Sequence, residues 1–208
     1  MLPLVLAALA AAAGCDLGSD EEDSGAPQRR AEDRGEGRSA APVERLRRGG
    51  FVVALRHAAT DSTAVDMTGD LRDCSRQRNL NAEGRRQARA IGRAFRQREM
   101  PVGRVLASPF CRTRDTARLA FGRLRPSRAL LSADFFGGGA AAARQRSGLR
   151  RLLATPPADG TNTVLVSHEA AIDTATGVTV DEGEAVIVGP ARGRPGFQVV
   201  TTVEADEW

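Results

Sequence analysis

Short apolar runs alternate with longer amphipathic stretches from residue 51 to the end of the chain, and this alternation constrains the fold more than any other feature. The runs with the length and apolar character of strands are Phe51–Leu55, Val105–Ala107, Thr163–Val166, Ala185–Val188 and Phe197–Val203. Helices are predicted over residues 81–98, 111–121 and 140–154. This order predicts an α/β fold with three α/β/α layers and a mostly parallel central sheet. The last two runs are so close together that they indicate an antiparallel edge.

The first 43 residues differ in composition from the rest of the chain. Leu2–Ala13 is an apolar, alanine-rich run that is too short to span a bilayer but has the length of a secretory signal core. Small residues then precede Cys15, an arrangement that resembles the lipobox of bacterial lipoproteins, in which the cysteine is lipidated. We therefore interpret residues 1–15 as a lipoprotein-type signal peptide with lipidation at Cys15. An ordinary secretory signal is the alternative.

Residues 16–43 are polar, charged and rich in glycine, with almost nothing apolar to bury. Such a segment is predicted to be a disordered linker. It would leave residues 44–208 as the folded domain, tethered on the periplasmic or extracellular side of a bacterial cell envelope. The membrane contact is then through the lipid anchor only.

Export also bears on the cysteines, because disulfides persist outside the cytoplasm. If Cys15 carries lipid, Cys74 and Cys111 remain as an even pair. We predict a disulfide between these two residues. Two buried free thiols are the alternative.

Composition narrows the possible functions. All 30 basic residues are arginine and the net charge is +4, but aromatic residues make up only 4% and no nucleic-acid motif is present. We therefore expect no nucleic-acid partner. Two histidines in separate segments, without a Cys-x-x-Cys pair, offer no metal ligand set. A Walker-type phosphate loop is excluded because the chain has no lysine. No cofactor is expected.

Cationic and imidazole side chains follow the ends of three predicted strands. The first strand runs into Arg56 and His57. The second is followed by Arg112, and the third by His168. Ligands bind at the carboxyl ends of strands in open α/β sheets. Arginine forks match phosphate oxygens, and an imidazole can attack phosphorus. The pattern therefore predicts a phosphoryl-transfer site.

Two further arginines, Arg76 and Arg78, lie in a polar stretch before the helix predicted over residues 81–98. They could meet an anionic substrate. Such residues more often belong to a solvated loop, so we leave both out of the predicted site.

Four segments resemble the motifs of the histidine phosphatase superfamily, in the family's order. They are Leu55–Thr60, Leu80–Ala88, Ser108–Ala117 and Val166–Glu169, and the likeness covers about residues 51 to 189. The resemblance implies the phosphoglycerate mutase-like fold and a histidine acid phosphatase-type phosphoric monoester hydrolase. A phosphorylated small molecule, glycan or protein is the implied substrate.

The resemblance also implies a role for each matching residue. His57 is the nucleophile and forms a phosphohistidine intermediate. Arg56 and Arg112 hold the phosphate, and Thr60 adds a hydroxyl contact. His168 donates a hydrogen bond to the phosphate and stabilises the transition state.

The general acid is less well defined. Some branches of the family place a carboxylate directly after the second histidine, where this chain has Glu169. Others take it from a loop after the arginine motif, where Asp134 stands. We prefer Glu169, with Asp134 and the absence of a dedicated acid as the alternatives. The chain between the arginine motif and His168 offers little insertion for a lid, so an open pocket is expected.

One residue departs from the family signature. Ala58 replaces the glycine that follows the nucleophile, and its methyl group could narrow the pocket or require a different backbone conformation. The alternative function is accordingly a catalytically weak, phosphate- or phosphoglycan-binding envelope lipoprotein.

Overall fold

The computed structural model describes residues 43–67, 70–191 and 196–208. The predicted signal peptide, residues 1–15 with Cys15, lies outside the described residues, as does the predicted linker up to residue 42. Val43 and Leu46 are buried in the core of the domain. The described domain therefore includes the residue at which the linker was predicted to end.

A six-stranded sheet forms the centre of the domain, and its strand order is β3-β2-β4-β1-β5-β6. The strands are β1 (Val52–Arg56), β2 (Val102–Ala107), β3 (Arg125–Pro126), β4 (Asn162–Ser167), β5 (Ala185–Pro190) and β6 (Phe197–Val203). The first four pair in parallel, whereas β5 pairs antiparallel with both β1 and β6. The predicted mostly parallel sheet and its antiparallel edge are confirmed.

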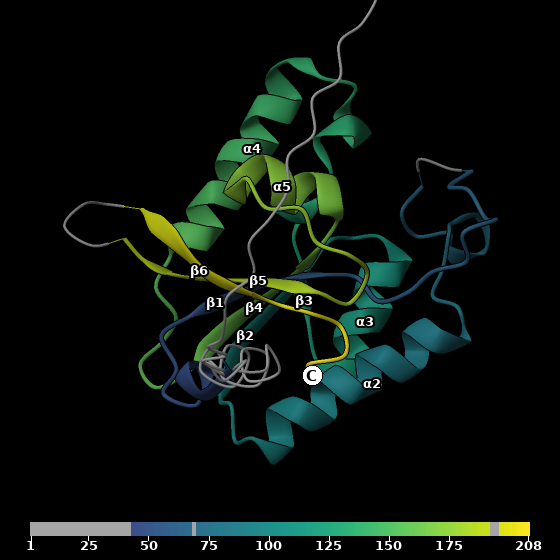
Figure 1. The fold of residues 1–208 in the computed structure, drawn as a ribbon. Helices are drawn as coiled ribbons and strands as arrows, with labels where there is room; N and C mark the ends of the chain where they lie inside the picture. Colours follow the sequence, from purple (N-terminus) through teal and green to yellow (C-terminus); the bar gives the residue numbers. More distant parts are fainter. Residues whose placement is uncertain (1–42, 68–69, 192–195) are drawn as a thin grey trace, which may run out of the picture. The chain divides into compact units, whose positions relative to one another are not determined.

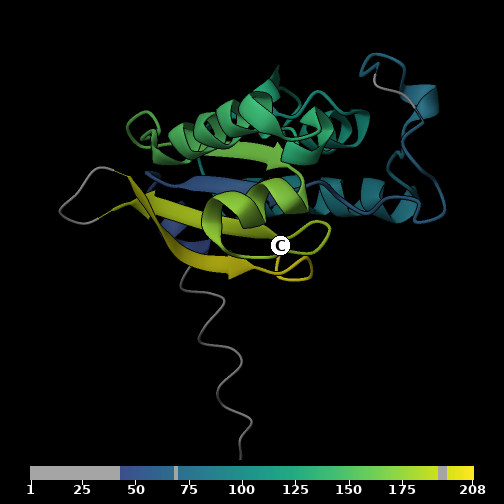
Figure 2. The same ribbon diagram turned by 90° about the horizontal axis from the view of Figure 1, so that it is seen from above.

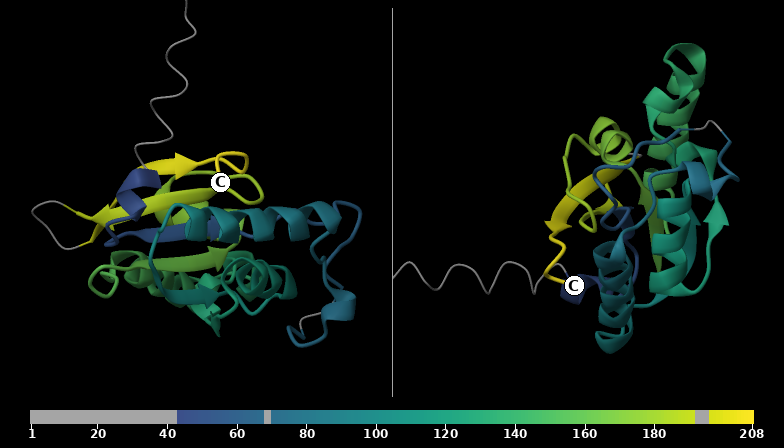
Figure 3. Two further views of the ribbon diagram at one scale, coloured as in Figure 1. Left: turned by 90° about the horizontal axis from the view of Figure 1, so that it is seen from below. Right: turned by 90° about the vertical axis from the view of Figure 1, so that its right-hand side faces the viewer.

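Helices cover both faces of this sheet. They are α2 (Ala82–Gln97), α3 (Cys111–Phe121), α4 (Gly139–Ala154) and α5 (Glu169–Thr176). Figure 1 shows α2 and α3 below the sheet and α4 and α5 above it, and the view from below shows α2 lying over the sheet, roughly along the direction of the strands (Figure 3). The predicted three-layer α/β/α fold is confirmed.

The domain has one apolar cluster on each face of the sheet, and alternate residues of the central strands contribute to one or the other. On β1, Val53 and Leu55 join the cluster that includes Ile91 of α2, whereas Val52 and Ala54 join the cluster that includes Leu149 of α4. Successive strand side chains point to opposite faces. Strands buried on both sides explain why these segments read as continuous apolar runs.

The segment between β1 and α2 positions the front of the domain. It extends beyond the carboxyl ends of the parallel strands (Figures 1 and 2). Asn81 ends it by capping α2, since its side chain accepts a hydrogen bond from the backbone N–H of Gly84 at 2.8 Å. A side chain at position 84 would collide with the Ala59 backbone, so glycine allows α2 to pack directly against the turn after β1.

Sequence analysis did not predict β3, α5 or the short 3₁₀ helices η1 (Cys74–Arg76), η2 (Arg128–Leu130) and η3 (Ala133–Phe136). The strand β3 has only two residues, too few for a periodic pattern. The helix α5 begins directly after His168 and has eight residues. None of the described helices is long and apolar enough to cross a membrane.

Candidate active site

A cavity of about 610 Å³ opens at the carboxyl ends of the parallel strands. It is polar, and the charged residues and histidines that line it come from four separate segments. These residues are Arg56, His57, Asp66, Arg78, Arg112, Asp134, His168 and Glu169. The structure thus brings together the two histidines and two arginines that sequence analysis placed at strand ends.

His57 lies at the end of β1 and is 2% exposed. Its Nδ1 is 2.9 Å from the carbonyl oxygen of Ala58, an arrangement in which Nδ1–H donates and Nε2 keeps the free electron pair. Burial lowers the pKa of His57 to about 3, and the charges of Arg112 and Arg56 act in the same direction. The imidazole is therefore neutral and has the electron pair that a nucleophile requires.

His168 faces the first imidazole, and the two ring centroids are 5.6 Å apart. Its Nε2 is 2.8 Å from the hydroxyl oxygen of Ser108, and its Nδ1 is 3.5 Å from Nη2 of Arg112. Burial, followed by the charge of Arg112, holds the pKa of His168 well below its usual value. Because a guanidinium can only donate, the contact with Arg112 makes Nδ1 an acceptor and leaves Nε2–H to donate to the Ser108 hydroxyl. In the other tautomer the Ser108 hydroxyl donates to Nε2, and Nδ1–H can donate to a phosphate oxygen.

Protein acceptors hold one nitrogen of each site arginine. Arg56 Nη1 donates to the carbonyl oxygen of Val180 at 2.8 Å and lies 2.6 Å from Oε2 of Glu169. Arg112 Nη1 donates to both carboxylate oxygens of Asp66, at 3.0 and 3.1 Å. The Nε atoms of both arginines are buried and have no hydrogen-bond partner within the described residues. Buried donors of this kind need an acceptor, which an oxyanion in the cavity can supply.

A covalent link fixes the start of α3 beside this cavity. Cys74 and Cys111 form a disulfide, which confirms the predicted pair. The buried Gln77 adds a second link, because its Oε1 accepts the backbone N–H of Cys111 at 2.9 Å. Arg112 follows Cys111 directly, so the segment before α2 and this cavity arginine are held together.

The structure does not bring Thr60 into the cavity, although the resemblance implied a phosphate contact for its hydroxyl. Its Oγ1 donates to Glu182 at 2.6 Å, and its backbone N–H donates to the same carboxylate at 3.1 Å. Thr60 is buried and also forms a β-bridge with Leu80. Thr60 therefore organises the turn after β1 rather than the cavity wall.

Glu182 was missed by sequence analysis. Its Oε1 lies 3.8 Å from Nδ1 of His57, and its backbone oxygen accepts a hydrogen bond from Gln87 at 2.9 Å. It stands in the turn before β5, where no spacing or motif marks it. Only the tertiary contacts reveal its place beside His57.

The substitution of alanine for the family glycine at position 58 does not narrow the cavity. The Ala58 methyl group packs in a small cluster with Leu80, Ala88 and Leu119, away from the cavity lining. Among the described non-glycine residues only Glu99 has a positive φ, so Ala58 adopts an ordinary backbone conformation. Its N–H donates to Thr116 at 3.0 Å.

Both carboxylates considered as general acid line the cavity. Glu169 begins α5, and its side chain is 47% exposed and paired with Arg56. Asp134 accepts a 3.3 Å hydrogen bond from the Ser132 hydroxyl. Arg78 also lines the cavity, so its assignment to a solvated loop was wrong, whereas Arg76 is exposed and donates to the carbonyl of Met67. No cluster of three metal-ligating side chains occurs among the described residues.

Together, the parallel sheet and the histidine–arginine cavity at its carboxyl edge define an α/β protein with a cationic cavity whose chemistry suits an oxyanion. The family model of the histidine phosphatase superfamily (branch 1) matches residues 52–132. The chain resembles the histidine phosphatase superfamily over these residues, which are fewer than half of its 208. The match supports phosphatase activity in the broad sense. No curated protein sequence matches the chain.

Solved structures support the fold. A phosphoserine phosphatase mutant from Entamoeba histolytica, in complex with phosphoserine, is 12% identical with a TM-score of 0.52, covering 76% of this chain and 98% of that one. The protein histidine phosphatase SixA complexed with tungstate is 13% identical with a TM-score of 0.51, covering 75% and 97%. SixA from Nakamurella multipartitia is 20% identical with a TM-score of 0.50, covering 74% and 95%. At these identities the likeness concerns the fold alone.

Proposed function

We propose that this protein is a phosphomonoesterase of the histidine acid phosphatase type that forms a phosphohistidine on His57. The main support for the proposal is the environment and protonation state of the His57 imidazole. Its imidazole is buried and neutral, its Nδ1 is bonded to the Ala58 carbonyl, and its Nε2 is left for attack. Arg56 and Arg112 stand in the same cavity, with buried Nε donors that have no acceptor in the part of the chain that the structure describes.

In the first step, Nε2 of His57 attacks the phosphorus of the ester. The P–N bond forms while the P–O bond to the alcohol breaks, and a carboxylic acid protonates the leaving oxygen. In the second step, the resulting carboxylate removes a proton from water, the water oxygen attacks phosphorus, and the P–N electrons return to Nε2. Phosphate leaves and the acid is restored.

The cationic groups act on the phosphoryl group as it transfers. Arg56 and Arg112 offer hydrogen bonds to its equatorial oxygens, and His168 donates from Nδ1. Because Glu169 and Asp66 already hold Nη1 of the two arginines, neither guanidinium needs to reorganise when substrate binds. Glu169 is the proposed acid, with Asp134 as the alternative.

We also propose that the protein works outside the cytoplasm, anchored in the bacterial envelope by lipid on Cys15, on a phosphorylated small molecule, glycan or protein. The disulfide between Cys74 and Cys111 supports this placement, because such bonds persist in oxidising compartments. Fractionation of cells that express the full chain tests the anchor. A Cys15→Ser variant that stayed in the membrane fraction would contradict it.

The test of activity compares wild type with His57→Ala on a panel of phosphomonoesters, with a metal chelator present. We expect release of inorganic phosphate by wild type and background rates for the variant. Rapid acid-free quenching should also trap an acid-labile, base-stable phosphoenzyme in wild type only. A folded wild type that binds phosphate but hydrolyses no ester would instead favour the binding lipoprotein.

A further inference from the structure

Arg78 is the third arginine of the cavity and has no role in the steps above. It lies between the short helix η1 (Cys74–Arg76) and α2, and it is partly buried. It lines the same cavity as the two histidines. Its guanidinium is therefore presented to whatever occupies the cavity.

This guanidinium has no carboxylate partner among the described residues, unlike the other two. Arg56 is paired with Glu169 and Arg112 with Asp66, whereas within residues 43–67, 70–191 and 196–208 no hydrogen bond or ion pair involves the side chain of Arg78. Proteins seldom leave a charged fork unpaired inside a cavity unless a ligand completes it.

The backbone of Arg78 is held firmly. Its N–H donates to Asp66 at 2.9 Å, and its carbonyl oxygen accepts a 3.4 Å hydrogen bond from Arg112. One residue earlier, the buried Gln77 is bonded to Cys111, and the disulfide ties the start of η1 to the start of α3. An arginine on a fixed segment loses little conformational freedom when it binds an anion.

The transferred phosphoryl group already has two arginines and a histidine as donors. The positive charge of Arg78 is nevertheless close enough to lower the pKa of both histidines. A third guanidinium in the same cavity can bind a second negatively charged group of the substrate. Phe110 and Phe135 line the same cavity and are in edge-to-face contact, so they offer an apolar wall for the carbon skeleton between the two groups.

We propose that Arg78 is a specificity-determining residue that binds a second anionic group, a carboxylate or phosphate, on the leaving group of the substrate. This inference rests on the proposed phosphatase function. It narrows the substrate class to phosphomonoesters that carry another negative charge beyond the ester phosphate.

The experiment compares two esters of the same shape. Carboxyphenyl phosphate carries the second negative charge, and carbamoylphenyl phosphate replaces it with a neutral amide; the meta and para isomers of each cover different spacings. We expect kcat/KM of wild type to be about tenfold higher for one of the carboxyphenyl phosphates than for the matching carbamoylphenyl phosphate. This ratio is the effect of one hydrogen bond to a charged group. Arg78→Gln should abolish that preference, and its kcat/KM for carbamoylphenyl phosphate should stay within about twofold of the wild-type value.

The matched control is Arg72→Gln, which removes the same charge from an exposed position of the same segment, outside the cavity lining. It should retain the full preference. Equal losses on both esters in Arg78→Gln would show that Arg78 acts on the transferred phosphoryl group and would overturn the inference. So would a wild type with no preference on any isomer.

A binding experiment separates failure of the proposed phosphatase function from failure of the proposed Arg78 site. If no ester is hydrolysed, calorimetry with carboxybenzylphosphonate and carbamoylbenzylphosphonate measures the same preference without turnover. Tighter binding of the carboxylate compound by wild type, lost in Arg78→Gln, would support the anion site. Equal binding of the two compounds would refute it.

Discussion

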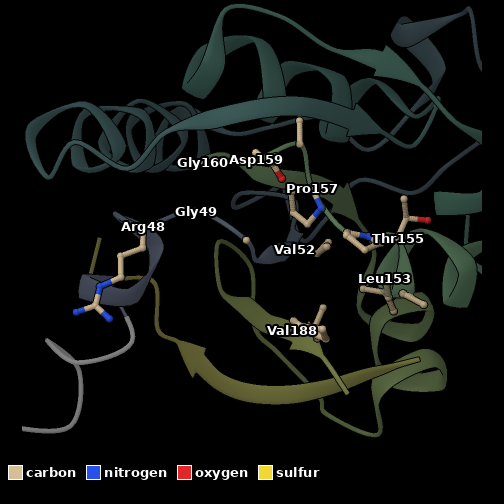
Figure 4. Close-up of a pocket in the computed structure, with 15 residues that line it drawn as sticks. Arg48, Gly49, Val52, Leu153, Thr155, Pro157, Asp159, Gly160 and Val188 are labelled. Carbon is tan, nitrogen blue, oxygen red and sulfur yellow. The ribbon is translucent and has the colours of Figure 1, made fainter. Parts of the chain in front are cut away.

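The two ends of the sheet differ in chemistry although the same strands build both. The cavity at the carboxyl ends is lined by three arginines, two histidines and three carboxylates. A smaller cavity of about 280 Å³ lies at the amino ends, where glycine, proline and apolar residues predominate and Arg48 and Asp159 are the charged residues. Figure 4 shows the side chains of Val52, Leu153 and Val188 there, with the Arg48 side chain pointing away from them.

Loop length accounts for much of this difference. At the amino end of β1 the chain arrives through Gly49, which lies so close to the backbone at Gly160 that no side chain would fit. At the carboxyl end, residues 57–81 separate β1 from α2, long enough to carry Asp66, the disulfide and Arg78 over the cavity. This domain therefore has tight, closely packed turns at one end of the sheet and a long loop, held by a disulfide, over the charged cavity at the other.

The largest contrast between the two ends is expected from arginine substitutions. Arg112→Lys keeps the positive charge opposite Asp66 but loses the planar fork that binds two phosphate oxygens. We expect kcat/KM for a phosphomonoester to fall by roughly 10²- to 10³-fold, the usual effect of removing a transition-state donor.

The matched control at the other end is Arg48→Lys, which should stay within about twofold of wild type. Thermal unfolding of both variants would show whether the fold is intact. Similar losses in the two variants would mean that the carboxyl-end cavity is not where phosphate is transferred.

Sequence analysis could predict the part of the site that lies at strand ends. Arg56, His57 and His168 directly end or follow buried apolar runs, so the parallel sheet alone places them together. Arg112 belongs to a motif of recognisable spacing. The disulfide followed from the export signal and the parity of the remaining cysteines.

The missed residues depend on tertiary contacts. Asp66 and Arg78 stand in a polar segment whose composition is that of a solvated loop, and the links through Gln77 and the disulfide return this segment to the cavity. Glu182 lies in a turn before β5 and meets Thr60 across 122 residues of sequence. No local periodicity encodes contacts of this kind.

The second prediction concerns which carboxyl group at the carboxyl end of the sheet acts as the general acid. Loss of an acid should matter most when the leaving alcohol is a poor one. We expect Glu169→Gln to lower kcat on an alkyl phosphate by about 10²-fold and on 4-nitrophenyl phosphate by far less. Asp134→Asn should change both by less than about threefold, and Asp159→Asn at the amino end should change neither.

Two other results would reassign the role. A leaving-group-dependent loss in Asp134→Asn, absent from Glu169→Gln, would make Asp134 the acid. An equal loss on both esters in Glu169→Gln would show that Glu169 serves only to hold Arg56, with which it is paired at 2.6 Å.

The last expected effect is on the free energy of unfolding as pH changes, and it too should arise at the carboxyl end of the sheet. Burial lowers the pKa of His57 to about 3 and that of His168 well below its usual value, whereas histidine in an unfolded chain titrates near 6.5. Between about pH 6.5 and 3 the unfolded chain therefore binds more protons than the folded one. The free energy of unfolding should rise with pH in this window and fall on acidification, by up to about 1.4 kcal/mol per pH unit for each histidine.

Urea unfolding at pH 7, 6 and 5 measures this slope. His168→Gln should reduce the slope below pH 6.5 relative to wild type, because one buried neutral imidazole is gone. Asp159→Asn, at the amino-end cavity, should leave the slope between pH 7 and 5 unchanged. If His168→Gln and wild type lost stability at the same rate, His168 would titrate alike in both states, and the carboxyl end would not be the acid-sensitive end of the sheet.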